Sequence, residues 1–255
     1  MSAAARATSV PTAVARLLLL VVVATFPTLA AWTYFVVWAH TPWMKVLYAA
    51  SKVVQAALPL LGWWALNMER RPARGSAAEF PSQAARPGAA LAGLISGGAI
   101  GGVVLAAFAG PLPAWLPFTE IARNIHERLV DLGAATPLRF LLLALGLSVA
   151  HSLFEEYYWR WFLFGQLQPR MPLPAALALS GLAFASHHWI VVDSFLGGQH
   201  RLAVTLPLTL TVAVGGAWWA WLFRRHRSLL APWLSHLLVD GALMAVGWQL
   251  VKHAL

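Results

Sequence analysis

The sequence predicts an all-α protein that crosses a membrane as a polytopic bundle of about seven transmembrane helices. Two observations lead to this fold class. Hydrophobic residues make up 60% of the 255 positions and charged residues only 11%, against roughly a quarter in soluble proteins. The apolar residues also gather into runs of about 20, the length that a helix needs to cross the bilayer.

The predicted spans follow one another through short connections. Their approximate ranges are 17–38, 46–66, 89–109, 140–166, 174–197, 202–223 and 229–251. The first span is taken as an anchor helix, because it is long and no small-residue cleavage site follows it. We expect one integral membrane unit with two parts, an N-terminal part over 1–139 and a C-terminal helix bundle over 140–255.

Two connections in the N-terminal part are distinctive. Residues 67–88 form a polar stretch with prolines, typical of a loop. Within residues 111–139, Ile121, Ile125 and Leu129 recur at helical spacing, with charged residues on the other side. This pattern predicts an amphipathic helix at the membrane interface, and an ordinary surface helix is the alternative.

The net charge of +9 comes from basic residues in the short connections, which indicates topology signals and contacts with anionic lipid, not a nucleic-acid partner. One side of the membrane would hold Arg6, Arg16, Arg70, Arg71, Arg74, Arg86, Arg170, Arg224, Arg225 and Arg227, and the other Lys45, Arg123, Arg128, Arg139, Arg201 and Lys252. This bias predicts a cytoplasmic N-terminus in a bacterial inner membrane. Cysteine is absent, so the chain has no thiol nucleophile and no thiolate metal ligand.

Ionisable residues lie inside three of the predicted spans. They are His151, Glu155, Glu156 and Arg160 in the fourth span, His187 and His188 in the fifth, and His236 and Asp240 in the seventh. An ionised side chain at the bilayer centre costs roughly 2.5–3.5 kcal/mol on insertion scales. Residues of this kind face the bundle interior, so we expect the three spans to bring them together.

Spacing assigns partners within this set, because residues four apart share one face of a helix. Glu156 and Arg160 are predicted to pair, which leaves Glu155 free for another neighbour. His236 and Asp240 also lie one turn apart. His187 points about 100° away from His188 on a helix, so at most one of the two is expected to be central.

Such a set fits hydrolysis inside a membrane, which needs a water, a base and donors for an oxyanion. A carboxylate in an apolar site is a competent base near neutral pH, so Glu155 is the predicted base. His188 would hold the same water or share its proton. His236 and Asp240 would polarise the scissile carbonyl.

Three motifs occur in order along the chain: Glu155-Glu156-x-x-x-Arg160, Phe184-x-x-x-His188 and His236-x-x-x-Asp240. Together they resemble the signature of the CPBP family, which groups CAAX prenyl endopeptidases of the Ras-converting type with bacterial Abi and bacteriocin-processing relatives. The resemblance extends over about 140–251, and the first three spans carry no motif.

The resemblance implies an intramembrane endopeptidase of glutamate type, with residues 140–255 as its catalytic bundle. Glu155 and His188 would activate water, and His236 and Asp240 would stabilise the oxyanion. The supporting residues would be Glu156, Arg160 and Phe184. The family usually has Asn or a similar residue at the last position, and an ionised Asp240 cannot donate, so orienting His236 is its alternative role.

The expected partners are membrane lipid and a membrane protein or peptide with a hydrophobic C-terminal segment, since EEYYWRWFLFG resembles the branch that cuts sorting signals. No cofactor is expected. The alternative is a zinc-dependent protease with Glu155, His188 and His236 as ligands, although no HExxH pair is present. A transporter or a non-catalytic membrane scaffold would be a different class, but no inverted repeat is evident.

Overall fold

The computed structural model confirms the all-α fold class, and it describes residues 10–68, 88–196 and 201–255, which contain no strand. The elements are α1 (Val10–Trp32), η1 (Thr33–Val37), α2 (Trp43–Trp64), α3 (Ala89–Ala109), α4 (Leu112–Trp115), α5 (Phe118–Leu132), α6 (Pro137–Leu145), η2 (Gly146–His151), α7 (Ser152–Glu155), η3 (Glu156–Phe164), α8 (Gly165–Leu167), α9 (Leu173–Leu196), α10 (Arg201–His226) and α11 (Leu230–Val251), where η marks a π-helix. Most of the predicted polar loop at 67–88 lies outside the described residues.

Seven helical segments in the described part are long and apolar enough to cross a membrane, which confirms the predicted number. They are Thr12–Val37, Trp43–Trp64, Ala89–Ala109, Pro137–Leu167, Leu173–Phe195, Leu202–His226 and Leu230–Val251. Each overlaps one predicted span. The apolar length that the bilayer imposes was therefore enough to find every span.

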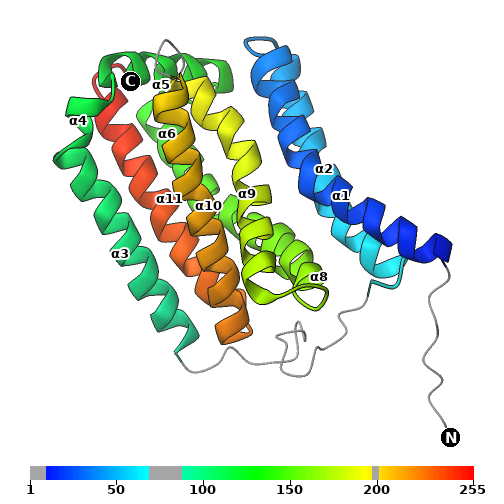
Figure 1. The fold of residues 1–255 in the computed structure, drawn as a ribbon. Helices are drawn as coiled ribbons and strands as arrows, with labels where there is room; N and C mark the ends of the chain where they lie inside the picture. The colour runs from blue at the N-terminus through cyan, green and yellow to red at the C-terminus, as the bar shows by residue number, and fades with distance from the viewer. Residues whose placement is uncertain (1–9, 69–87, 197–200) are drawn as a thin grey trace, which may run out of the picture.

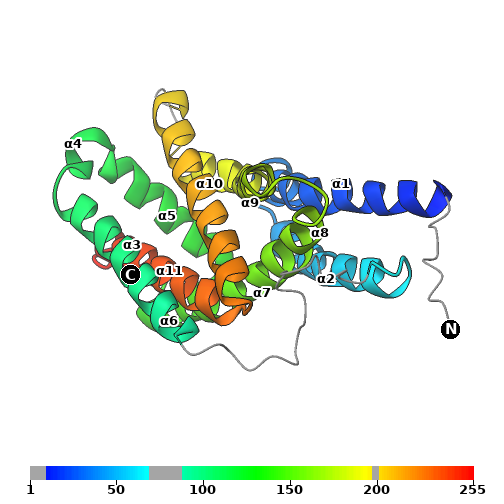
Figure 2. The ribbon, with the colours of Figure 1, turned by 60° about the horizontal axis from the view of Figure 1, so that its bottom comes forward.

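The C-terminal helices form the centre of the bundle. Helix α10 packs along α9 and also contacts α11, while α3 packs closely along α11 (Figure 1). Helices α1 and α2 form a pair at one side and contact the rest mainly through α1 and α9 (Figure 2). The span from α6 to α8 crosses between these two groups, so its residues can reach both.

Polar and apolar side chains are distributed as expected for a protein in lipid. Glu156 and Arg160 are fully buried, whereas Val53 and Val214 are 70% and 71% exposed on the outer surface. Around the buried charges lies an aromatic cluster that includes Trp159. The interior therefore shields charges from lipid, and the outer faces of the spans are apolar.

The fourth span is not a uniform α-helix. One turn of α-helix, α7 (Ser152–Glu155), lies between the π-helices η2 (Gly146–His151) and η3 (Glu156–Phe164). Hydrogen bonds in a π-helix run from i to i+5, and such segments are frequent at functional sites. The two adjacent glutamates lie at the boundary between α7 and η3, and helical periodicity alone did not predict this change.

The amphipathic helix predicted within 111–139 is α5 (Phe118–Leu132). It lies across the ends of α9 and α11 (Figure 1), with Ile121 and Leu129 buried and Ile125 packed beside them. The predicted apolar stripe therefore packs against the bundle. A position of this helix at the membrane interface stays a prediction.

Glycines allow α3 and α11 to approach closely. A Cβ atom on Gly97 would lie 2.7 Å from the carbonyl oxygen of Ser235, and one on Gly93 would lie 2.5 Å from that of Ala231. Both contacts are with backbone that cannot move aside cheaply. Small residues at such an interface are typical of helix packing in membranes.

We expect Gly97→Ala to lower the free energy of unfolding by about 1–3 kcal/mol, the usual effect of overpacking. Thermal unfolding in detergent, followed by the loss of the monodisperse species, measures this. Gly98→Ala is the matched control in the same helix, because a Cβ there meets nothing within 4 Å. Equal melting temperatures for the two variants would contradict the packing argument.

Candidate active site

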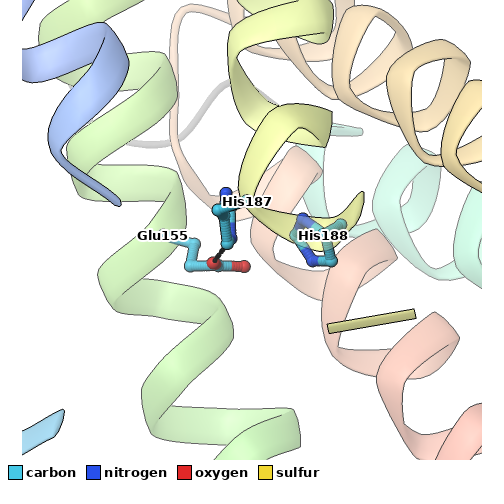
Figure 3. A group of neighbouring side chains, drawn as sticks. All are labelled: Glu155, His187 and His188. Carbon is cyan, nitrogen blue, oxygen red and sulfur yellow. Dashed lines mark hydrogen bonds and ion pairs between the residues drawn. The ribbon is translucent and has the colours of Figure 1, made fainter. Parts of the chain in front are cut away.

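Glu155 lies at the centre of a ring of histidines. Its Oε1 atom is 3.1 Å from Nε2 of His187 and 3.5 Å from Nε2 of His151, and its Oε2 atom is 3.7 Å from Nε2 of His236. The residue is 3% exposed. Figure 3 shows the carboxylate reaching from the fourth span toward His187 and His188 of α9. Imidazoles from three spans thus meet one carboxylate.

Glu156 faces a different set of partners, as predicted. Its Oε1 atom lies 3.2 Å from Nη1 of Arg160 and 2.8 Å from Nδ1 of His236. The guanidinium lies 4.3 Å from the Phe184 ring centre and 5.1 Å from that of Trp219, and Nη2 donates to the Gly216 carbonyl at 3.5 Å. Two aromatic faces and one carboxylate therefore surround this buried cation.

His236 joins the two glutamates. Its Nδ1 atom contacts Glu156, while its Nε2 atom faces Glu155 and also lies 3.5 Å from Oδ1 of Asp240. The ring stacks on Trp219 with centroids 3.9 Å apart and an angle of 17°. The indole Nε1 of Trp219 donates to Ser235 at 3.0 Å, next in the chain to His236. This stacking fixes the plane of the imidazole.

Both histidines of α9 lie near Glu155, so the expectation that only one would be central is wrong. One ring nitrogen from each of His187 and His188 and one oxygen of Glu155 all lie within 4.8 Å of one another. Adjacent side chains on a helix diverge, but a carboxylate that lies between their two directions can meet both. His187 makes the direct hydrogen bond, and its ring stacks on Trp159 with an angle of 5°.

His188 is oriented by Phe184, the other residue of its motif. Its Nδ1 atom lies 3.1 Å from the carbonyl oxygen of Phe184, one turn earlier, where an Nδ1–H can donate. In that tautomer Nε2 keeps its lone pair for the site. The Phe184 ring, 1% exposed, contacts the rings of His188 and His236 at centroid distances of 4.6 and 5.8 Å.

The structure thus brings together every residue that the three motifs single out. Glu155, Glu156, Arg160, Phe184 and His236 are buried, whereas His188 and Asp240 are half-buried at the edge of the group. Asp240 approaches His236 only at 3.5 Å, so its contact is looser than that of Glu156.

One group of side chains in the described part has the donors and spacing to hold a metal ion, and it differs from the predicted zinc set. It consists of Glu155, His187 and His188, so His187 takes the place of His236. The reason is that Nδ1 of His236 contacts Glu156 at 2.8 Å, and its other nitrogen faces the opposite oxygen of Glu155.

The fit of this group to zinc is partial. One carboxylate and two imidazoles leave a fourth position open, as in catalytic zinc sites. Ligating histidines usually donate their other ring N–H to a second group. The bond from His188 to the Phe184 carbonyl meets that need, but Nδ1 of His187 is buried with no hydrogen-bond partner in the described part of the chain.

Sequence reasoning gave too little weight to two residues of this site. His187 was set aside as a neighbour of His188, and Trp219, which stacks on His236, was not considered. The available signal was the His-His pair inside the second motif. His151 contacts Glu155, four residues later in its own span.

Comparison with known proteins identifies the region that carries the site. Residues 137–242 match the family model described as "Type II CAAX prenyl endopeptidase Rce1-like". No curated protein and no solved structure matched the chain. The match begins with α6, ends within α11 and includes all three motifs. This match supports the CPBP family of CAAX-type proteases for the region that carries the site, and the seven apolar helices support an integral membrane protein.

Proposed function

We propose that this protein cleaves peptide bonds of membrane-associated substrates with a water that Glu155 activates. One observation carries the proposal: the Glu155 carboxylate is buried in an apolar bundle and is surrounded by imidazoles from three spans. A carboxylate shielded from bulk water, with adjacent proton acceptors, is what a general base in a membrane requires.

In the proposed reaction, Glu155 takes a proton from water while the water oxygen attacks the carbonyl carbon of the scissile bond. His188, with Nδ1–H directed to Phe184, offers Nε2 as an acceptor for the same water. The proton then passes from Glu155 to the leaving nitrogen as the carbon–nitrogen bond breaks. The products are a new C-terminal carboxyl group and a free amine.

His236 is the proposed donor to the oxyanion. Both of its ring nitrogens face carboxylate oxygens, so an imidazolium would donate from Nδ1 to Glu156 and present Nε2–H toward the site. Asp240 lies one turn later and acts through His236, because an ionised carboxylate cannot donate a hydrogen bond itself. We therefore assign Asp240 to orienting His236 and to stabilising its protonated form.

The proposed substrates are membrane proteins whose C-terminal segment is hydrophobic. The family match supports a protease of CAAX type, and the motif region resembles a branch that cuts sorting signals. The proposed location is a bacterial inner membrane with the N-terminus in the cytoplasm, supported by the excess of arginine on that side.

We expect Glu155→Gln and His188→Ala each to lower cleavage by about 10²–10⁴-fold, the usual effect of losing a general acid or base. The measurement compares C-termini of membrane proteins by mass spectrometry from cells that express each variant. Substrates should accumulate uncut with both variants and be cut with Glu127→Gln, an exposed carboxylate on α5. Full cleavage by Glu155→Gln would falsify the assignment of the base.

Glu156 and Arg160 have a supporting role, so their loss should affect stability first. Arg160→Met leaves a buried carboxylate without its cation, and we expect a loss of about 3–5 kcal/mol in the free energy of unfolding. The double variant Glu156→Gln/Arg160→Met removes both charges and should recover part of that loss. Melting temperatures in detergent of the wild-type protein, of the single variants Arg160→Met and Glu156→Gln and of the double variant test this, and additive losses would contradict direct pairing.

A zinc-dependent version of the reaction is the second candidate, supported by the cluster of Glu155, His187 and His188. There the metal would polarise the attacking water, and His187 would become a ligand. We favour the metal-free reaction, because the buried Nδ1 of His187 has no hydrogen-bond partner among the described residues, whereas ligating histidines usually have one.

We therefore expect turnover of the purified protein to survive dialysis against EDTA and 1,10-phenanthroline, with zinc well below one ion per chain by mass spectrometry. Stoichiometric zinc that His187→Ala abolishes, together with chelator-sensitive turnover, would establish the second candidate instead.

A further inference from the structure

Two serine hydroxyls meet where α3 packs against α11. The Oγ atoms of Ser96 and Ser235 lie 3.0 Å apart, and each also accepts a hydrogen bond from an indole of α10. Trp218 donates from Nε1 to Ser96 at 2.7 Å, and Trp219 donates from Nε1 to Ser235 at 3.0 Å. Side chains of three spans are thus joined by hydrogen bonds at a point that directly precedes His236 in the chain.

Burial determines the direction of the hydrogen bond between the two serines. Ser235 is 0% exposed, whereas Ser96 is half-buried. If Ser96 were the donor, the O–H of Ser235 would have no acceptor among the described residues, because its other contact, the indole of Trp219, is itself a donor. A buried donor without an acceptor is costly. We therefore orient the pair so that Trp219 donates to Ser235 and Ser235 donates to Ser96.

The close approach of α3 to α11 makes this last contact possible. A Cβ atom on Gly97 would lie 2.8 Å from Cα of Ser235, so a larger residue next to Ser96 would push the two helices apart. Helix α3 (Ala89–Ala109) lies outside residues 137–242, which match the family model. Ser96 is therefore a contribution of the N-terminal half to the surroundings of a motif residue, His236.

Trp219 connects the serine pair to His236. The two rings stack with centroids 3.9 Å apart, and the Phe184 ring meets each of them edge-on at 5.8 Å. The stack holds the imidazole plane only while the indole keeps its own orientation, and the hydrogen bond to Ser235 is the directional contact of that indole. Without Ser96 as acceptor, the hydroxyl of Ser235 would turn to the carbonyl four residues earlier, as helical serines often do. Its oxygen would then leave the indole.

We propose that Ser96, acting through Ser235 and Trp219, is a positioning residue for His236, the proposed donor to the oxyanion. The inference rests on the proposed function and deepens it, because it assigns the orientation of the oxyanion donor to a helix that has no family motif. An interaction made only in the transition state changes kcat and leaves KM unchanged. Loss of Ser96 should therefore slow the reaction without weakening the binding of substrate.

A simpler role for the serine pair would be to hold α3 against α11. Hydrogen bonds between serines are common in the packing of membrane helices. In that role, replacement of Ser96 would lower the stability of the bundle, but each folded molecule would react at the normal rate. The two roles therefore differ in kcat per folded chain, and in whether the effects of replacing Ser96 and Trp219 are coupled.

The experiment uses the full chain in phosphatidylcholine vesicles with two labelled probes. One ends in S-farnesyl-Cys-Val-Ile-Met, and the other is an unprenylated Leu-Ala helix of about 20 residues, the length of one span. Rates are divided by the amount of folded chain, measured as the monodisperse fraction in size-exclusion chromatography. The variants are Ser96→Ala, Ser96→Thr, Trp219→Phe and the double variant Ser96→Ala/Trp219→Phe. Ser194→Ala is the matched control, because Ser194 is also half-buried and donates only to Ile190 of its own helix, at 2.7 Å.

We expect Ser96→Ala to lower kcat by about 3- to 10-fold with KM unchanged, the effect of one lost hydrogen bond between neutral groups. Ser96→Thr keeps the acceptor oxygen and should retain the wild-type kcat. Trp219→Phe keeps an aromatic ring but loses the N–H, and should lower kcat at least as much as Ser96→Ala. The double variant should be no slower than Trp219→Phe, because Ser96 acts through that indole. Ser194→Ala and Trp218→Phe, which removes the indole that does not stack on His236, should keep the wild-type kcat.

Several results would overturn the inference. A Ser96→Ala chain with the wild-type kcat per folded molecule would leave the serine pair as a contact between helices, with the proposed protease intact. Losses that multiply in the double variant would show that Ser96 does not act through Trp219. If the wild-type chain cleaves neither probe, the proposed function fails, and the positioning role fails with it.

Discussion

The buried contact among Glu156, Arg160 and His236 is the constraint on which the rest of the bundle depends. A charge in the interior of a membrane bundle is costly unless an opposite charge lies beside it. Arg160 meets one carboxylate, one backbone carbonyl and two aromatic faces. These partners come from α9, α10 and its own span, and His236 adds α11. Four spans thus meet at one buried cation.

This contact also bears on the direction of Glu155, the proposed base. Glu155 directly precedes Glu156, so its side chain leaves the helix about 100° away. With Glu156 directed toward Arg160 and His236, Glu155 extends toward α9, where His187 and His188 lie. The order of the two glutamates therefore gives the carboxylate proposed as the base different neighbours from the one that pairs with Arg160. A buried pair that contributes little net stability can still specify such a geometry.

The sequence predicted the features that depend on the length of an apolar run or on the spacing of residues along one helix. All seven spans came from apolar length, because the bilayer requires that length regardless of tertiary contacts. The Glu156–Arg160 pair came from its four-residue spacing. The convergence of His187 and His188 on Glu155 depends on the rotation of α9 relative to the fourth span. Residue spacing within one helix does not predict that rotation. The π-helices likewise shift the hydrogen bonds by one residue with no composition signal, and they lie on both sides of the α-helical turn that ends at Glu155.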